Sequence, residues 1–199
     1  MNTTEDLNLD GNYWSNRYDD GTAVWDLGEV SPPLKNYIDQ LTDKNIRILI
    51  PGCGNTYEAD HLLKLGFTDI TVIDIAPALV AQLKEKYKDN QNIKIVLGDF
   101  FEHQGEYDLI LEQTFFCALD PALRKGYVAK MDELLAPNGK LVGVLFNRRF
   151  EEQGPPFGGD KKEYEPMFAN NFIFKTFEPC YNSFIKRKDS ELFINLVKK

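Results

Sequence analysis

The chain has 199 residues, a formal net charge of −8 at pH 7, and 43% hydrophobic residues. This length suits one compact domain that buries about two-thirds of its unfolded surface. Ordinary glycine and proline contents, 14 and 10 residues, exclude collagen-like and low-complexity chains. No apolar run approaches the ~18 residues of a membrane helix, and the polar start of the chain shows no secretory signal. We therefore expect a cytoplasmic protein without membrane contact.

The charge and the residue types favour a small molecule as the ligand. An acidic chain lacks the lysine and arginine stripe that nucleic acids require. The three cysteines, Cys53, Cys117 and Cys180, show no C-x-x-C spacing, and there are only two histidines. This pattern predicts neither a disulfide framework nor a zinc site. We expect no nucleic-acid partner and no metal.

Strand-like and helix-like segments alternate along the middle of the chain. Five short apolar runs predict buried strands, at residues 47–50, 69–74, 92–97, 107–111 and 140–146. Amphipathic segments predict helices at residues 77–88 and 121–135, each beginning with a proline, which suits a first helical turn. This alternation indicates right-handed βαβ units in a doubly wound, mostly parallel α/β sheet.

The last third of the chain has a different pattern. It predicts a Gly/Pro-rich loop at residues 147–159 and a short helix at residues 160–170. Two strands follow, at residues 172–185 and 191–197, joined by a turn at residues 188–190. The two strands would form a C-terminal antiparallel hairpin and complete a seven-stranded sheet. A parallel sheet that ends in this way is the layout of class I methyltransferases. We expect residues 1–199 to form one domain.

A glycine turn follows the first predicted strand, in the sequence Pro51-Gly52-Cys53-Gly54, and leads into a helix. Glycines at these positions allow a tight turn and a close approach of the backbone to a ligand. Asp74 ends the second strand, 20 residues after Gly54, which is the usual offset of a carboxylate that binds ribose hydroxyls. The alternative is a plain strand-to-helix connection, in which Asp74 caps the helix that begins near Pro77.

Three further residues narrow the choice of ligand. Tyr57 occupies the position where dinucleotide sites usually carry a third glycine. Its bulk favours a nucleoside without pyrophosphate, such as S-adenosylmethionine (SAM). Asp99 follows the third strand and faces the same crevice, where it would accept a hydrogen bond from the adenine amino group, unless it is a solvated loop residue. Glu112 closes the fourth strand at the same edge and carries a weaker expectation of the same kind.

The sequence resembles the thiopurine S-methyltransferase-like family, most closely its halide, thiocyanate and thiol methyltransferase branch. The matching stretches run in order from Tyr13 to Phe157, at residues 13–14, 25–28, 31–34, 51–54, 72–75, 98–101, 107–110, 115–121, 124 and 154–157. The resemblance implies SAM as the cofactor and S-adenosylhomocysteine as its product. It also implies that the N-terminal tail and lid segment, residues 1–35, closes over the cofactor.

The resemblance assigns contacts on the cofactor and on the acceptor. For the cofactor, it implies that Trp14 and Trp25 form walls and that Gly52 and Gly54 contact the methionine portion. Asp74 would contact the ribose, and Asp99 with Phe100 the adenine. Glu112 would lie at the strand end beside the sulfonium. The acceptor pocket would include Gln113, Phe116 and Phe157. Thiopurine-type members carry an arginine at the position of Gln113, so a carboxylated aromatic thiol is a less expected acceptor.

Methyl transfer is an in-line displacement, in which positioning alone can supply ~7–11 kcal/mol of the barrier. For a thiolate or halide acceptor a dedicated base is optional, and we expect His61 and His103 to be surface or packing residues. Cys53 is either a reactive thiol at a helix N-terminus or simply a small side chain. Of Phe115 and Phe116, at least one should belong to the ordinary core rather than face the sulfonium. Trp14 and Trp25 lie in a polar segment, which favours the lid over core packing.

The sequence thus predicts a monomeric SAM-dependent methyltransferase that acts on the sulfur of a small thiol or thiopurine-like molecule, or on a halide or thiocyanate. Two alternatives stay open. One is an NAD(P)-dependent oxidoreductase on a similar sheet, and the other is a module that binds SAM or a nucleoside without catalysis. Methyl transfer to oxygen or nitrogen is a further possibility, because aromatic residues do not specify the nucleophile.

Overall fold

The computed structural model describes residues 8–23, 25–151 and 154–199. The helices are α1 (Gly11–Asp19), α2 (Pro32–Ile38), α3 (Tyr57–Lys64), α4 (Pro77–Lys86), η1 (Phe100–Glu102), α5 (Phe115–Ala118), η2 (Pro121–Leu123), α6 (Arg124–Leu134), α7 (Lys161–Phe168) and η3 (Ile185–Arg187). The strands are β1 (Ile48–Pro51), β2 (Ile70–Asp74), β3 (Ile93–Leu97), β4 (Tyr107–Gln113), β5 (Leu135–Phe146), β6 (Phe172–Pro179) and β7 (Glu191–Lys198).

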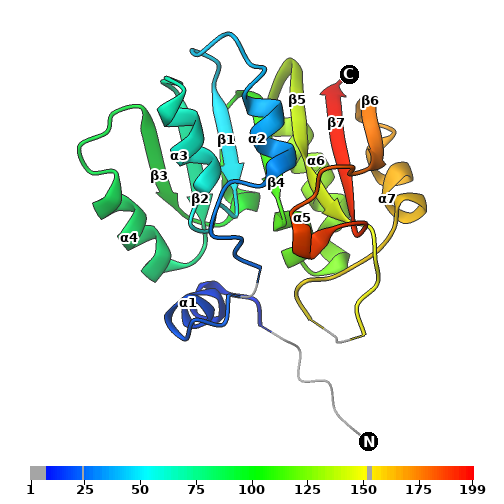
Figure 1. The fold of residues 1–199 in the computed structure, drawn as a ribbon, viewed down its shortest axis with the longest axis horizontal. Helices are drawn as coiled ribbons and strands as arrows, with labels where there is room; N and C mark the ends of the chain where they lie inside the picture. The colour runs from blue at the N-terminus through cyan, green and yellow to red at the C-terminus, as the bar shows by residue number, and fades with distance from the viewer. Residues whose placement is uncertain (1–7, 24, 152–153) are drawn as a thin grey trace, which may run out of the picture.

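The strands form one seven-stranded sheet in the order β3-β2-β1-β4-β5-β7-β6 (Figure 1). The first five strands are parallel, and β7 runs antiparallel between β5 and β6. Starting from β1, the chain adds β2 and β3 on one side of the sheet and then β4 and β5 on the other side, so the order of strand addition reverses at β1. Such a switch point leaves a crevice at the carboxyl ends of the central strands. The predicted fold class is confirmed.

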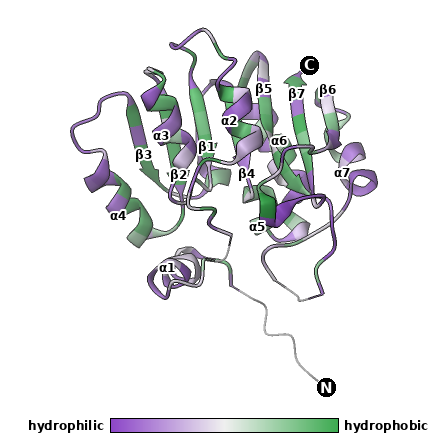
Figure 2. Cartoon of the chain, viewed as in Figure 1, coloured by the Kyte–Doolittle hydropathy of each residue, from purple (hydrophilic) through white to green (hydrophobic). Residues whose placement is uncertain are grey.

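The sheet is covered by helices on both faces because its side chains alternate. Ile48 and Ile50 of β1 belong to a core cluster with residues of α2, α3 and α4, whereas Leu49 belongs to a second cluster with residues of α6 and α7. The central strands are therefore apolar on both sides, and Figure 2 shows them as the green centre of the molecule. This double burial explains why the strands were readable as continuous apolar runs.

The hairpin at the C-terminus differs from the prediction in its connection. β6 ends at Pro179, and residues 180–190, which include η3, join it to β7. The prediction of strand to residue 185 was wrong because the partner strand β7 begins only at Glu191, whose carbonyl pairs with Cys180 N–H, and the chain then turns through η3. The long helix predicted at residues 121–135 is also divided, into η2 and α6.

The N-terminal region contains two helices that the sequence patterns did not indicate. Leu34 and Ile38 of α2 are completely buried in the core, so the end of the predicted lid belongs to the body of the protein. α1 packs on α4, where the Oγ atom of Ser15 accepts a hydrogen bond from Ala78 N–H at 3.4 Å. Figure 1 shows α1 below the carboxyl ends of β1 and β2. Residues 1–7 of the predicted tail lie outside the described residues.

Candidate active site

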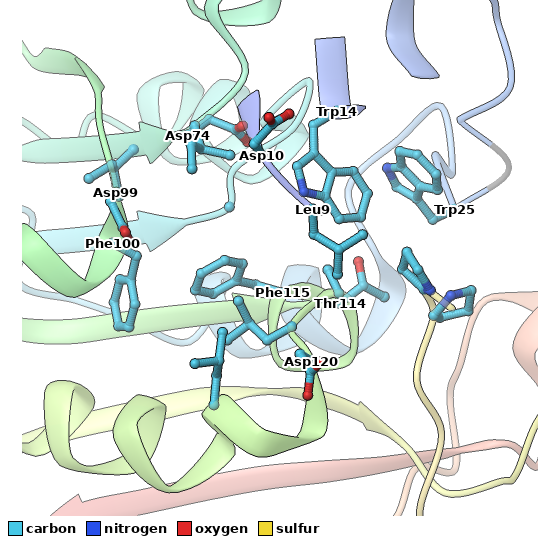
Figure 3. Close-up of a pocket in the computed structure, with 18 of the residues that line it drawn as sticks. Leu9, Asp10, Trp14, Trp25, Asp74, Asp99, Phe100, Thr114, Phe115 and Asp120 are labelled. Atoms are coloured by element: carbon cyan, nitrogen blue, oxygen red, sulfur yellow. The ribbon is translucent and has the colours of Figure 1, made fainter. Parts of the chain in front are cut away.

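A cavity of about 390 Å³ lies at the carboxyl ends of β1 to β5, between the sheet and α1 (Figure 3). Its lining includes seven of the predicted site residues, namely Trp14, Trp25, Gly52, Asp74, Asp99, Phe100 and Gln113. The predicted residues outside this lining are Gly54, Glu112, Phe116 and Phe157. Figure 3 shows Asp99 and Phe100 at one end, Trp25 at the opposite end, and Phe115 between them.

The glycine turn needs both of its glycines. Gly52 and Gly54 have φ angles of 53° and 52°, a region that disfavours side chains. A Cβ atom on Gly52 would lie 2.2 Å from the Phe115 ring, and one on Gly54 would lie 3.0 Å from the Tyr18 hydroxyl. The turn is therefore packed directly against two aromatic side chains of the site.

Asp74 connects the glycine turn to the end of β2. The residue is only 8% exposed, and its carboxylate accepts hydrogen bonds from Gly54 N–H at 3.1 Å and Ala76 N–H at 3.0 Å. Burial raises the pKa of Asp74, and these backbone donors oppose the increase. Helix α4 begins without a side-chain cap, so Asp74 is not its cap. The carboxylate fixes the turn and at the same time lines the cavity.

The two tryptophans stand together over the cavity. The rings of Trp14 and Trp25 meet edge to face, with centroids 5.4 Å apart, and Tyr18 packs on Trp25 at 5.9 Å. Trp14 and Tyr18 also pack on the core cluster beneath α3 and α4. Trp14 thus lies between the core and the cavity, whereas Trp25 lines the cavity and packs on Trp14 and Tyr18.

The segment that carries Trp25 is fastened at two points. Asp26 accepts hydrogen bonds from the Asn55 amide and, at 3.2 Å, from the Tyr57 hydroxyl, both at the glycine turn. The buried guanidinium of Arg187 donates to the Trp25 carbonyl at 2.6 Å. The bulky Tyr57 therefore anchors this segment.

Glu112 lies beneath the cavity wall instead of in it. The side chain is 0% exposed and accepts hydrogen bonds from the N–H groups of Phe115 and Phe116 at 2.7 and 3.1 Å, and from the Tyr127 hydroxyl. Burial raises the pKa of Glu112 to about 7, against these hydrogen bonds. The carboxyl holds the turn between β4 and α5, in which Thr114 has a φ of 63°. A β-branched residue rarely adopts this conformation, so the turn depends on such support.

Gln113 presents an unmatched polar group to the site. Its amide oxygen and nitrogen are both buried and have no hydrogen-bond partner in the part of the chain that the structure describes. The residue lines the large cavity and also a smaller one of about 60 Å³, whose lining includes Gly54. Tyr18, Trp25, Gly52 and Thr114 also border both. The two cavities are thus neighbouring compartments of one site.

Phe116 and Phe157 do not take the positions expected of them. Phe116 is completely buried in the core, with ring centroids 5.1 Å from those of Tyr127 and Tyr164. The N–H of Phe157 donates to the Cys117 carbonyl at 2.6 Å, which ties its loop to α5. Adjacent residues on a short helix point in different directions, so Phe115 lines the cavity and Phe116 does not.

Several lining residues were not identified from the sequence, namely Asn8, Leu9, Asp10, Thr114, Leu119, Asp120, Leu123 and Phe146. Asp10 caps α1 by accepting hydrogen bonds from the N–H groups of Asn12 and Tyr13. An aspartate before a helix start is a signal that the sequence does contain. It would have located α1 and hence Asp10.

The remaining candidate residues are the two histidines, His61 and His103, and the thiol of Cys53. His61 pairs with Asp39 at 2.6 Å, and His103 contacts the Tyr107 hydroxyl at 2.7 Å. Neither histidine lines the cavity, as expected. Burial raises the pKa of the Cys53 thiol far above its usual range, which favours the small-side-chain interpretation.

The fold is that of class I methyltransferases. A 1,6-didemethyltoxoflavin-N1-methyltransferase from Burkholderia thailandensis, crystallised with S-adenosylhomocysteine, matches with a TM-score of 0.74 at 19% identity, over 94% of this chain and 86% of that one. A TehB-like SAM-dependent methyltransferase from Corynebacterium glutamicum matches with a TM-score of 0.66 at 19% identity, over 95% and 98% of the two chains.

The sequence comparisons define the family. The profile of the thiopurine S-methyltransferase (TPMT) family matches residues 9–192, and the chain belongs to this family. A probable thiol methyltransferase 2 from Arabidopsis thaliana is 31% identical, over 77% of this chain and 70% of its own length. A thiocyanate methyltransferase 1 from Brassica oleracea is 28% identical, over 78% and 71%.

Family membership makes the protein a SAM-dependent methyltransferase. The predicted function, SAM-dependent methylation of thiol-type acceptors, is confirmed by this family membership. The oxidoreductase and non-catalytic alternatives are not supported. Among the described residues, no helix is long and apolar enough to cross a membrane.

Proposed function

We propose that the cavity binds SAM across the carboxyl ends of the strands. Asp74 would accept hydrogen bonds from the ribose hydroxyls, and Asp99 with Phe100 would hold the adenine at the β3 end. Gly52 and Gly54 would contact the methionine portion, with the smaller compartment beside Gly54. Trp14 and Trp25 would cover the cofactor from the side of α1.

Three features of the site fit this cofactor. The cavity offers aromatic rings, Trp14, Trp25 and Phe115 among them, which attract a sulfonium cation by about 0.5–2 kcal/mol per well-placed ring. The amide of Gln113 has hydrogen-bonding capacity that no described residue uses. Asp74 already accepts two backbone hydrogen bonds, and a carboxylate has about four lone-pair sites. It can therefore still accept from hydroxyl groups.

The reaction would be methyl transfer to the sulfur of a small thiol. SAM supplies an electrophilic methyl group on a positively charged sulfur. The chain has to align the acceptor with that group and exclude water, because positioning contributes most in such a displacement. Phe115, Phe146 and the Pro155-Pro156 loop provide apolar walls for this purpose, and a thiolate needs no catalytic base.

The observation that carries this proposal is the apolar character of much of the cavity lining. This lining includes Ala118, Leu119, Leu123, Phe146, Pro155 and Pro156. A soft, poorly hydrated sulfur nucleophile suits these walls better than a strongly hydrated oxygen or nitrogen nucleophile. Among relatives, the names thiol, thiocyanate and thiopurine methyltransferase all specify sulfur compounds.

Calorimetry with SAM, S-adenosylhomocysteine and NAD would test the cofactor assignment, followed by an acceptor screen of thiols, thiocyanate and iodide. We expect micromolar binding of the first two ligands and turnover with small thiols. Asp74→Asn should weaken SAM binding at least tenfold, since hydrogen bonds to a charged group contribute about 1.5–3 kcal/mol. Unchanged affinity in this variant would refute the ribose contact, and SAM binding without turnover of any thiol would refute the acceptor class.

The compartment and the assembly state remain predictions. We propose a cytoplasmic monomer that acts on small molecules, without a nucleic-acid partner or a metal. The free, buried state of Cys53, Cys117 and Cys180 supports a reducing compartment, and the net charge of −8 opposes binding to nucleic acid. Size-exclusion chromatography with light scattering would test the monomer.

A further inference from the structure

The loop at residues 154–159 forms one wall of the cavity without being helix or strand. Pro155 and Pro156 line the cavity, in the connection from β5 to α7 that Figure 1 draws in yellow. The N–H of Phe157 fastens the loop to α5, through the Cys117 carbonyl at 2.6 Å. A proline has no N–H to donate, so this wall depends on hydrogen bonds made by the residues beside it.

One buried arginine holds two carbonyls of this loop. Arg124 begins α6 and is 1% exposed. One of its terminal nitrogens, Nη2, donates to the carbonyls of Phe157 and Gly158 at 3.1 and 3.0 Å. The other, Nη1, donates to the carboxylate of Glu163 on α7 at 2.8 Å. The guanidinium thus connects the loop to both α6 and α7.

Two aromatic rings pack on this guanidinium and restrict its position. Its central carbon lies 4.8 Å from the centre of the Phe116 ring and 5.2 Å from that of the Tyr164 ring. The two rings are completely buried and meet edge to face, with centroids 5.1 Å apart. A planar group that packs on rings while it donates hydrogen bonds in two directions is a property of arginine that lysine does not share.

A buried cation is a costly way to hold a half-buried loop. The removal of a guanidinium from water is offset only by good geometry and further hydrogen bonds, and Nε of Arg124 has no partner among the described residues. The carboxylate of Glu163 is also shared with Arg149, at 3.2 Å. What this arrangement secures is the position of two carbonyls directly after Pro156. Since Pro156 lines the cavity, the arginine determines where this wall stands.

We propose, on the basis of the function proposed above, that Arg124 is a positioning residue for the methyl acceptor. It does not line the cavity, so it acts through the Pro155-Pro156 wall, against which the acceptor would lie. Methyl transfer depends on the alignment of the reacting atoms, and a displacement of about 1 Å can cost about 100-fold in rate. Asp74 and Asp99, assigned to SAM, accept hydrogen bonds from backbone groups outside this loop, so cofactor binding should not depend on the arginine.

Arg124→Lys tests the proposal, and Arg149→Lys is the matched control, because Arg149 contacts the same Glu163 with a side chain that is 71% exposed. Calorimetry gives the SAM affinity and the number of binding sites, and kcat/KM is measured for thiophenol and naphthalene-2-thiol at saturating SAM. In Arg124→Lys we expect kcat/KM for thiophenol, per SAM-binding site, to fall at least tenfold, with the SAM Kd within twofold of wild type. The ratio of naphthalene-2-thiol to thiophenol should rise at least threefold, because a displaced wall admits the larger ring. The control should change neither quantity.

A merely structural role would reduce the number of SAM-binding sites but leave the activity per site and the thiol ratio unchanged, and that result would overturn the proposal. If Arg124→Lys binds no SAM, Gly158→Ala decides, since a Cβ there would lie 2.0 Å from the Arg148 carbonyl and would displace the loop. The same rise in the thiol ratio is expected, and an unchanged ratio would refute control by the wall. If the wild type binds SAM but methylates neither thiol, the thiol function fails and this proposal with it.

Discussion

The floor and the cover of the cavity are built in different ways. The floor consists of the glycine turn and the β4–α5 turn, in which the buried carboxylates of Asp74 and Glu112 accept backbone hydrogen bonds. The cover consists of residues 8–23 and 25–28 and the loop at 154–159, which are held by side-chain contacts from Asp26, Arg187 and Arg124. Substitutions in the floor should therefore affect both folding and binding, and substitutions in the cover should affect mainly binding.

The largest effect should follow from removing the carboxyl of Glu112. Glu112→Ala leaves two buried N–H groups and the Tyr127 hydroxyl without their acceptor. An unsatisfied buried group costs about 1–3 kcal/mol, so we expect a loss of about 3 kcal/mol or more in the free energy of unfolding. Urea denaturation would measure it. The isosteric Glu112→Gln keeps an acceptor and should lose less than half as much, and equal losses in both variants would contradict the role given to the hydrogen bonds.

The pH dependence of stability should depend on the same side chain. Its pKa rises from 4.5 to about 7 in the folded protein, so the folded state favours the protonated form. This contribution is complete below pH 4.5 and is lost as the pH rises through 7, by about 3 kcal/mol at 1.36 kcal/mol per unit. Tm should therefore fall more steeply from pH 5 to 7.5 in the wild type than in Glu112→Gln. Parallel profiles would show that another group is responsible.

Substitutions in the cover should have smaller effects, confined to binding. Trp25→Ala should weaken SAM binding about tenfold, since it removes up to ~2 kcal/mol of aromatic contact with a cation. The free energy of unfolding without ligand should change by no more than about 1 kcal/mol. Asp26→Ala, which removes the carboxylate that accepts hydrogen bonds from Asn55 and Tyr57, should weaken binding about threefold, because these bonds hold the segment that carries Trp25. Calorimetry and thermal unfolding measure both quantities, and a matched loss of stability in Trp25→Ala would place this residue in the core.

The sequence was sufficient for the glycine-turn half of the floor, because that half depends on local signals. Apolar runs marked the strands, and Gly52, Gly54 and Asp74 lie within one strand-turn-helix-strand unit. The choice between Phe115 and Phe116 was beyond the sequence, because it depends on the direction of a one-turn helix. Glu112 was expected in the cavity because it ends a strand, but in the structure its side chain turns back to the N–H groups of α5.

The cover was harder to predict because distant residues hold it. Arg187 and the Trp25 carbonyl are 162 positions apart, and no periodicity connects them. The N-terminal segment is polar, so an apolar stripe did not mark α1. The signal that does exist, the capping aspartate Asp10, locates a helix but does not indicate what the helix covers.

The pairing of Trp14 and Trp25 gives the protein a built-in optical reporter. These are its two tryptophans, and both stand on the cavity wall with their rings in edge-to-face contact. The intrinsic tryptophan fluorescence therefore comes entirely from this wall. Emission selectively excited in the indoles would follow the cover as it meets a ligand, without a dye or an introduced label.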